Sequence, residues 1–218
     1  MGREKPKQFL HLKGKPVLGH VLEKFLALSD LFSEIVVVIP PGSREYCREI
    51  LLDLELDVST VLFIEGGEER QDSVHEGLKH ISESKRVISI HDGVRPLVSS
   101  SLVEKIAREA EKYKAVIPVM PLKETLKEVN GNGKVIKTVP RENFRAVQTP
   151  QGFHRETILK AYEWAKENNF SFTDDAALVE GMGEQVYTVP GEVKNLKITT
   201  PEDLLWAEFL LSQEDGNV

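Results

Sequence analysis

The sequence has very little cysteine, with a single residue, Cys47, among 218. One cysteine cannot form a disulfide within the chain or supply a zinc site built from several thiolates. This excludes the disulfide-rich secreted class of protein and is typical of a reducing compartment. We therefore expect a cytoplasmic protein.

The sequence also lacks long apolar runs and an excess of positive charge. No apolar stretch approaches the roughly 20 residues that cross a bilayer, and the polar start is not typical of a signal peptide. Lys and Arg number 28 against 35 Asp and Glu, a formal charge of −7. This balance disfavours a broad surface for nucleic acid or for an anionic membrane. Any phosphate-binding site must therefore be local.

The chain contains short β-branched runs that alternate with segments of helical period. This order predicts an α/β protein with a largely parallel sheet. The expected strands lie at 35–39, 61–64, 87–90, 115–119 and 185–189. The expected helices lie at 17–27, 44–54, 69–81, 102–113, 156–167, 174–182 and 201–211.

Residues 121–146 break this alternation. Two short runs, 125–129 and 134–139, flank a turn rich in Asn and Gly and predict a β-hairpin. Because a lone hairpin is marginal in water, we expect it to pack on something outside its own layer, such as a second subunit. We treat the whole chain, 1–218, as one domain with an arm at about 121–146.

Two loops follow expected strands, at the edge where open α/β sheets bind ligands. The first carries Gly66-Gly67, which would let a base or a phosphate approach the backbone, although a plain turn is the alternative. In the second, at 91–96, Asp92 could bind a metal or a hydroxyl and Arg95 could bind a phosphate. An ordinary surface ion pair is the alternative there. His91 is more typical of a hydrogen-bonded structural histidine.

Six segments are each weak signals alone and become informative through their order. They are Pro6-Lys7-Gln8-Phe9-Leu10, Gly66-Gly67 with Arg70 and Ser73, His91-Asp92 with Arg95-Pro96, Thr149-Pro150-Gln151, Thr173-Asp174-Asp175-Ala176, and Asn195-Leu196-Lys197-Ile198-Thr199 before Pro201-Glu202-Asp203-Leu204. Together the chain resembles the 2-C-methyl-D-erythritol 4-phosphate cytidylyltransferase family over nearly its whole length. The resemblance implies a Rossmann-like nucleotidyltransferase fold.

The same resemblance implies cytidylyl transfer from CTP to 2-C-methyl-D-erythritol 4-phosphate, a step of isoprenoid synthesis. An acceptor phosphate oxygen attacks the α-phosphorus in line, so the protein aligns two anions and offsets charge rather than supplying a nucleophile. By resemblance the catalytic cations are Lys7 and Lys197, the nucleotide residues are Gly66, Gly67, Glu68, Ser73 and Gly93, and the acceptor residues are Asp92, Arg95, Thr125, Arg141, Thr149 and Thr173.

The resemblance also implies a homodimer in which the arm carries Thr125 and Arg141 to the partner's site. Mg²⁺ is expected on the triphosphate oxygens and water, with no protein ligand assigned. Two alternatives stay open. One is a non-catalytic homologue that binds a ligand or a partner, and the other is a cytidylyltransferase for another sugar-alcohol phosphate, such as ribitol 5-phosphate.

The family pattern places an apolar strand and a Gly-rich loop with an arginine ahead of the segment that begins here at Met1. We therefore expect the natural protein to start upstream with that strand and loop. We also expect the chain from Met1 to be poorly stable and inactive with CTP.

Overall fold

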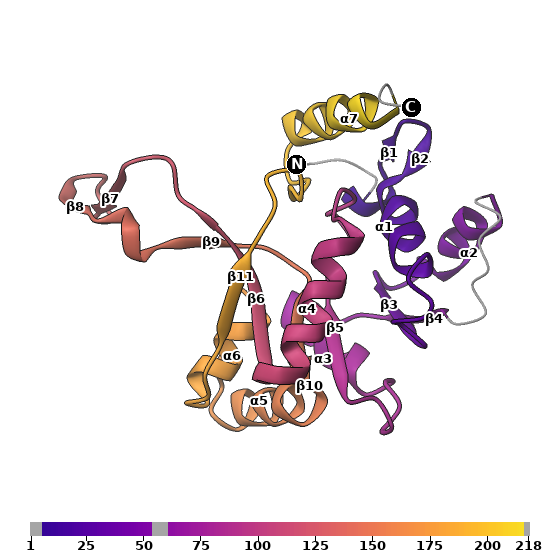
Figure 1. The fold of residues 1–218 in the computed structure, drawn as a ribbon, viewed down its shortest axis with the longest axis horizontal. Helices are drawn as coiled ribbons and strands as arrows, with labels where there is room; N and C mark the ends of the chain where they lie inside the picture. The colour runs from indigo at the N-terminus through magenta and orange to yellow at the C-terminus, as the bar shows by residue number, and fades with distance from the viewer. Residues whose placement is uncertain (1–5, 54–60, 216–218) are drawn as a thin grey trace.

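The computed structural model describes residues 6–53 and 61–215 (Figure 1). Its α-helices are Val17–Leu26 (α1), Arg44–Asp53 (α2), Arg70–Leu78 (α3), Ser100–Tyr113 (α4), Arg155–Glu167 (α5), Asp175–Gly181 (α6) and Pro201–Asp215 (α7). Its strands are His11–Leu12 (β1), Lys15–Pro16 (β2), Ile35–Ile39 (β3), Val61–Glu65 (β4), Val87–Ile90 (β5), Ala115–Pro121 (β6), Leu126–Val129 (β7), Val135–Val139 (β8), Arg145–Val147 (β9), Gln151–His154 (β10) and Tyr187–Pro190 (β11). The predicted α/β class is confirmed, and the predicted elements begin and end within a few residues of the observed ones.

The main sheet is mixed, which corrects the largely parallel sheet expected from the sequence. Its strand order is β11-β6-β10-β5, with β9 also paired to β6. β11 runs parallel to β6, whereas β10 lies antiparallel between β5 and β6. The segment Gln151-Gly152-Phe153-His154 has no β-branched residue and therefore carries no clear local strand signal.

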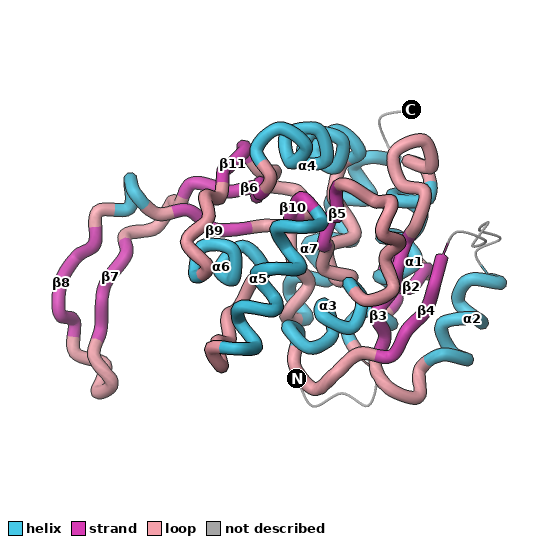
Figure 2. The backbone as a smooth tube through the Cα atoms, turned by 90° about the horizontal axis from the view of Figure 1, so that it is seen from below, coloured by secondary structure: helices cyan, strands magenta, loops and turns pink. Residues whose placement is uncertain are grey.

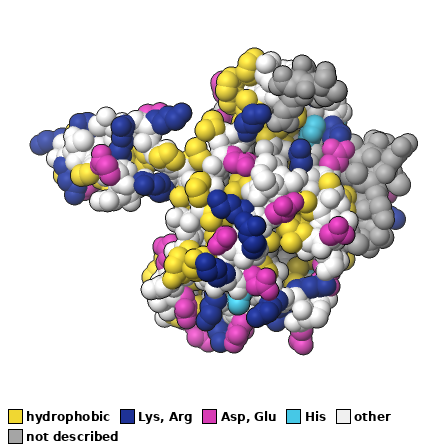
Figure 3. Space-filling model, viewed as in Figure 1, with side chains coloured by type: hydrophobic (Ala, Val, Ile, Leu, Met, Phe, Trp, Pro, Cys, Tyr) yellow, Lys and Arg dark blue, Asp and Glu magenta, His cyan; other side chains and the backbone are white. Residues whose placement is uncertain are grey.

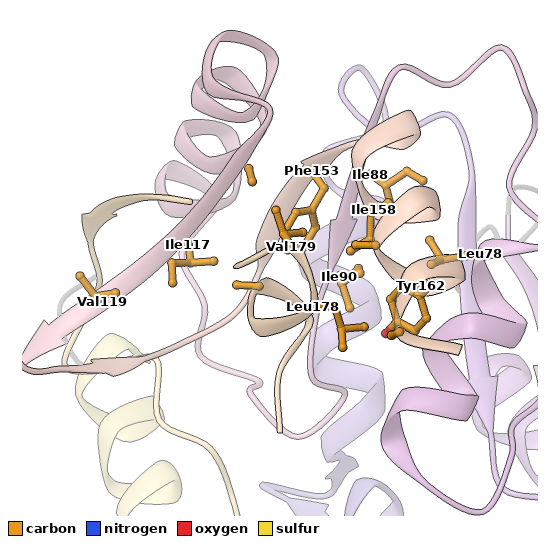
Figure 4. Packing of buried hydrophobic residues seen from close by; sticks show 14 residues of the cluster. Leu78, Ile88, Ile90, Ile117, Val119, Phe153, Ile158, Tyr162, Leu178 and Val179 are labelled. Atoms are coloured by element: carbon orange, nitrogen blue, oxygen red, sulfur yellow. The ribbon is translucent and has the colours of Figure 1, made fainter. Parts of the chain in front are cut away.

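Close packing of α4 and α5 on the sheet explains why β10 forms. A methyl group added to Gly152 would lie 2.7 Å from Ile106 Cγ2 in α4, so this close approach requires glycine. On the other face, Phe153 is fully buried among apolar side chains of β5, α5 and α6 (Figure 4). Burial of such a side chain contributes roughly 2–3 kcal/mol. Tertiary packing therefore outweighs the weak local preference.

Polar side chains cap the amino ends of helices α4 and α6. Ser99 Oγ accepts a hydrogen bond from Leu102 N at 3.1 Å, and this cap begins α4. Asp174 Oδ1 accepts from Ala177 N at 3.1 Å and begins α6. The loops that precede these helices meet at Arg70, which pairs with Asp92 in one and with Asp175 at the end of the other.

Strands β3 and β4 form a separate parallel pair. Within the described ranges, β3 pairs only with β4 and β5 pairs only with β10. An apolar cavity of about 410 Å³ lies between β3 and β5. The resemblance places a strand ahead of Met1, and that expectation stays a prediction.

The predicted hairpin forms from β7 and β8, which pair antiparallel. Figures 1 and 2 show it standing away from the rest of the molecule. Val129, Val135 and Ile136 are 51–57% exposed on it. A single domain with a dimerisation arm stays a prediction.

The C-terminal helix α7 covers β1 and presents apolar side chains outward (Figure 3). Leu205 is 67% exposed, and the rings of Trp206 and Phe209 stack at 5.1 Å. No helix in the described part of the chain combines the length and apolar character needed to cross a bilayer.

Candidate active site

The candidate site is centred on Asp92, in the loop that follows β5. Its carboxylate lies 3.1 Å from Lys197 Nζ, 3.1 Å from Arg95 Nε and 3.3 Å from Arg70 Nε. Burial by itself raises the pKa of Asp92, but the charges of Lys197, Arg70 and Arg95 lower it to about 2. The carboxylate is therefore ionised throughout the neutral pH range.

Arg70, the first residue of α3, joins Asp92 to a second carboxylate. Its Nη2 lies 2.7 Å from Asp175 Oδ2, and the Tyr162 hydroxyl donates to Asp175 Oδ1 at 2.6 Å. Asp175 is only 1% exposed, so its oxygens need such partners. Burial opposes the charge of Arg70, but Asp175 and Asp92 outweigh it and raise the pKa of the guanidinium above its usual value.

Sequence reasoning did not assign a site role to Arg70 or Asp175. Both lie within segments that carry the family resemblance, and this was the only signal available for them. Their contact joins residues 105 positions apart in the chain.

The cluster carries an excess of positive charge. Arg70, Arg95 and Lys197 face the carboxylates of Asp92 and Asp175, which leaves one positive charge uncompensated. The Lys197 side chain is 42% exposed, whereas that of Arg95 is 10% exposed. The Arg70 side chain is 34% exposed, so an anion from solvent can meet Lys197 and Arg70 but not the buried Arg95.

A short hydrogen-bond chain fixes the Asp92 loop. The backbone N–H of Asp92 donates to Thr149 Oγ1 at 3.0 Å, which in turn lies 3.0 Å from His91 Nδ1. His91 Nε2 lies 3.2 Å from the carbonyl oxygen of Arg95, which can only accept, so Nε2 carries the proton and Nδ1 accepts from Thr149. Burial lowers the pKa of His91 to about 4, and the ring is neutral at pH 7.

Two predicted acceptor residues, Thr149 and Arg95, are thus engaged inside the protein. Thr149 is 5% exposed and holds the Asp92 loop. Arg95 Nη1 donates to the Asn195 carbonyl at 2.9 Å, and Asn195 Nδ2 donates to the Thr149 carbonyl at 2.8 Å. Both side chains support the loop, and their direct contact with an acceptor stays a prediction.

The glycine loop between β4 and α3 lies beside this cluster. The N–H of Gly66 donates to the Ile39 carbonyl at 2.9 Å. A methyl group added to Gly67 would lie 2.4 Å from Asp72 Cβ. Asp72 cannot move freely, because it forms a capping box with Glu69 at the start of α3. Close packing therefore requires glycine in this loop.

The remaining predicted nucleotide residues surround the same loop. Ser73 Oγ lies 3.5 Å from the Gly67 carbonyl, and Glu68 is exposed. The two glycines line a cleft of about 300 Å³ with side chains of α3. Gly93 lines the larger cavity together with Asp92 and Lys197.

The other predicted residues lie outside the Asp92 cluster. Lys7 is exposed in a short 3-10 helix, and its neighbour Gln8 lines the larger cavity. Thr125 and Arg141 are exposed at the base of the hairpin arm, where the Arg141 guanidinium donates to the Lys123 carbonyl. Thr173 is exposed just before the cap of α6. Their predicted roles remain predictions.

Comparison with known proteins identifies the family to which the chain is similar. Residues 1–213 match the family model for 2-C-methyl-D-erythritol 4-phosphate cytidylyltransferase. Proteins of that name from Desulforamulus reducens and Bacillus mycoides are 40% and 42% identical, and the matches cover 99% and 97% of this chain and 92% of each relative.

Solved structures agree. The 2-C-methyl-D-erythritol 4-phosphate cytidylyltransferase from Thermus thermophilus superposes with a TM-score of 0.78 at 36% identity, covering 94% of this chain and 93% of that one. The 4-diphosphocytidyl-2C-methyl-D-erythritol synthase from Anaerococcus prevotii gives 0.84 at 32% identity, covering 93% and 88%. The resemblance drawn from the six sequence segments is confirmed: the chain belongs to the 2-C-methyl-D-erythritol 4-phosphate cytidylyltransferase family.

Proposed function

We propose that the chain transfers the cytidylyl group of CTP to 2-C-methyl-D-erythritol 4-phosphate and releases pyrophosphate. The observation that carries the proposal is the Asp92 cluster, which holds an excess positive charge beside the Gly66-Gly67 loop in a member of this family. The phosphate group of the acceptor would compensate that charge.

In this proposal the nucleotide lies along the glycine loop and the acceptor phosphate meets Lys197. An acceptor phosphate oxygen forms a bond to the α-phosphorus, and the bond from that phosphorus to the pyrophosphate oxygen breaks. Both reactants are anions, so alignment and positive charge from Lys7 and Lys197 lower the barrier. The ion pair with Asp92 at 3.1 Å holds Lys197 in place before the acceptor arrives.

Mg²⁺ enters this proposal as part of the nucleotide substrate. Among the residues that the structure describes, no group of three His, Cys, Asp or Glu side chains is placed to hold a metal. Both oxygens of Asp92 already face cations. In this proposal triphosphate oxygens and water hold the ion, which suits an ion that keeps much of its hydration shell.

The homodimer and the cytoplasmic location belong to the same proposal. The exposed apolar residues of the arm support a partner surface, because a hairpin cannot bury both of its own faces. Mixing Arg141→Ala protein with Lys7→Ala protein should restore some active sites if Arg141 serves the partner's site. No recovery, with subunit exchange verified, would place Arg141 in the site of its own chain or in none.

Calorimetry and turnover test the proposed reaction. Lys197→Met should weaken acceptor binding about 10- to 100-fold, as expected for a charge-assisted hydrogen bond, and should leave CTP affinity nearly unchanged. Lys160→Met is the matched control, because Lys160 also pairs with a carboxylate, Glu156 at 2.7 Å, outside the cluster. Equal losses in both variants would contradict the assignment of Lys197.

Pyrophosphate release, measured with each of two acceptors, decides among the alternatives. We expect release with 2-C-methyl-D-erythritol 4-phosphate from a complete enzyme that carries the strand and loop implied by the resemblance. Faster release with ribitol 5-phosphate would assign the other acceptor. Binding of CTP and acceptor without release would favour the non-catalytic homologue.

A further inference from the structure

The segment that carries Lys197 has no regular structure of its own. Residues 191–200 join β11 to α7, and none of these described residues lies in a helix or a strand (Figure 1). Backbone that lies outside helices and sheets needs other hydrogen-bond partners where it is buried. The position of the Lys197 ammonium group therefore depends on the groups that bind this segment.

The side-chain amide of Gln148 binds the segment as a neighbouring strand would. Gln148 lies between β9 and β10 and is 8% exposed. Its Oε1 accepts a hydrogen bond from Glu192 N at 3.0 Å, and its Nε2 donates to the Glu192 carbonyl oxygen at 2.8 Å. A strand in an antiparallel pair makes the same two bonds to one opposing residue. The Gln148 amide thus replaces the missing strand partner at Glu192.

The same amide also fixes the residue two positions before Lys197. Gln148 Nε2 donates to the Asn195 carbonyl oxygen at 3.1 Å, and Arg95 Nη1 donates to the same oxygen at 2.9 Å. Because Asn195 is 0% exposed, solvent does not supply a substitute for a lost donor. Arg95 Nε also pairs with Asp92 at 3.1 Å. The Asn195 carbonyl therefore connects Gln148 with the cations around Asp92.

Backbone hydrogen bonds hold the two ends of the segment. Gly191 N donates to the Val119 carbonyl at 2.9 Å, and Ile198 N donates to the Val94 carbonyl at 2.9 Å. A methyl group added to Gly191 would lie 2.5 Å from Gln148 Oε1, so the amide can reach the segment only past a glycine. Gln148 thus supports the stretch between these two ends.

We propose that Gln148 is a positioning residue for acceptor binding, because its amide holds residues 192–195 where Lys197 Nζ meets Asp92. That Nζ lies 3.1 Å from Asp92 Oδ2. Gln148 acts on the backbone of the segment, so it does not compete with an acceptor phosphate for the Lys197 ammonium group. The effect on the acceptor rests on the proposed function, whereas the hold on the segment does not.

Gln148→Met tests both parts of the proposal. Methionine is unbranched and close to glutamine in length and volume, but its side chain lacks the amide donor and acceptor. The control for a general loss of stability is Ile158→Val, which removes one methyl group from a fully buried side chain of α5. Both variants are made in the full chain.

Amide hydrogen exchange measures the hold on the segment. Gln148→Met should speed exchange at Glu192 and also at Ile198 at least about tenfold, because release of the middle of the segment frees its end as well. Ile158→Val should leave both amides unchanged. Faster exchange at Glu192 alone would overturn the proposal, since the hold of Gln148 would then end before Lys197.

A double-mutant cycle, measured by calorimetry, tests the effect on the acceptor. Gln148→Met should weaken binding of 2-C-methyl-D-erythritol 4-phosphate about 3- to 10-fold, less than the loss of Lys197 itself, with CTP affinity unchanged. In a Lys197→Met background the same substitution should cause no further loss. An equal loss in both backgrounds would overturn the proposal, because Gln148 would then act without Lys197.

Gly191→Ala reaches the same contact from the other side, which guards against poor folding of Gln148→Met. The added methyl group must displace the Gln148 amide, so this variant should reproduce the faster exchange at Ile198 and the weaker acceptor binding. If both variants keep wild-type exchange and affinity, the proposal is wrong. If Lys197→Met alone leaves acceptor affinity unchanged, the proposed function is contradicted, while faster exchange at Ile198 would still support the hold of Gln148 on the segment.

Discussion

Replacing Asp92 with asparagine should cost stability in a way that depends on pH. The pKa of Asp92 lies at about 2, against an ordinary value of 3.8, because Lys197, Arg70 and Arg95 outweigh the effect of burial. At about 1.4 kcal/mol for each pH unit between these values, the ionised carboxylate contributes about 2 kcal/mol to the free energy of unfolding at pH 7. The asparagine side chain has nearly the same shape as aspartate but carries no charge, so the Asp92→Asn variant loses this contribution.

The sign follows from the lowered pKa. The contribution is complete above about pH 5, where the unfolded carboxyl is also ionised, and it is lost progressively as the pH falls from about 5 toward 1. Urea unfolding of the wild type and Asp92→Asn should therefore differ by about 2 kcal/mol at pH 7 and by roughly half as much at pH 3. Glu156→Gln, which removes a solvent-exposed pair with Lys160, should leave the free energy of unfolding nearly unchanged at both pH values. A difference between wild type and Asp92→Asn that is the same at both pH values would refute the electrostatic account.

Three further predictions concern the glycine loop, the histidine and the N-terminal lysine. Gly67→Ala should weaken CTP binding about tenfold or more, because the added methyl group displaces the start of α3. Gly131→Ala is the control: a methyl group added there meets no atom within 4 Å and should leave CTP affinity unchanged. Calorimetry with CTP checks both variants, and equal affinities would contradict the close-packing argument. The pKa of His91 is lowered to about 4, so as the pH falls the unfolded chain binds this proton first, and the free energy of unfolding should fall by up to about 3 kcal/mol between pH 6.5 and 4. His91→Gln should reduce this dependence of the unfolding free energy on pH, as measured by urea unfolding. An unchanged dependence would contradict the assignment to His91. In a complete enzyme, Lys7→Ala should lower kcat about 10²- to 10³-fold with little change in CTP affinity. A steady-state assay showing unchanged kcat would remove Lys7 from the mechanism.

The sequence predicts the helices and most strands well, because their apolar periodicity and caps are local signals. It does not predict β10, whose pairing depends on Gly152 meeting Ile106 across the core, a contact between residues distant in the chain. The same limit explains the expectation of a largely parallel sheet, since the antiparallel direction of β10 follows from that placement.

For the site, the family segments led to Asp92, Arg95, Thr149 and Lys197, which the structure brings together. They did not distinguish side chains that face solvent from those that support the loop. That distinction depends on burial: the Arg95 side chain is 10% exposed and that of Lys197 is 42% exposed. Arg70 was missed because its two carboxylate partners come from different parts of the fold.

The double contact of Arg70 would couple the binding of the two substrates in the proposed reaction. A nucleotide that shifts the start of α3 also shifts Arg70, and with it the charge that Asp92 and Asp175 present to an acceptor. Such coupling is reciprocal: whatever factor the nucleotide applies to acceptor affinity, the acceptor applies to nucleotide affinity. Arg70→Lys, which cannot hold both carboxylates in a fork, would bring the two binding steps closer to independence.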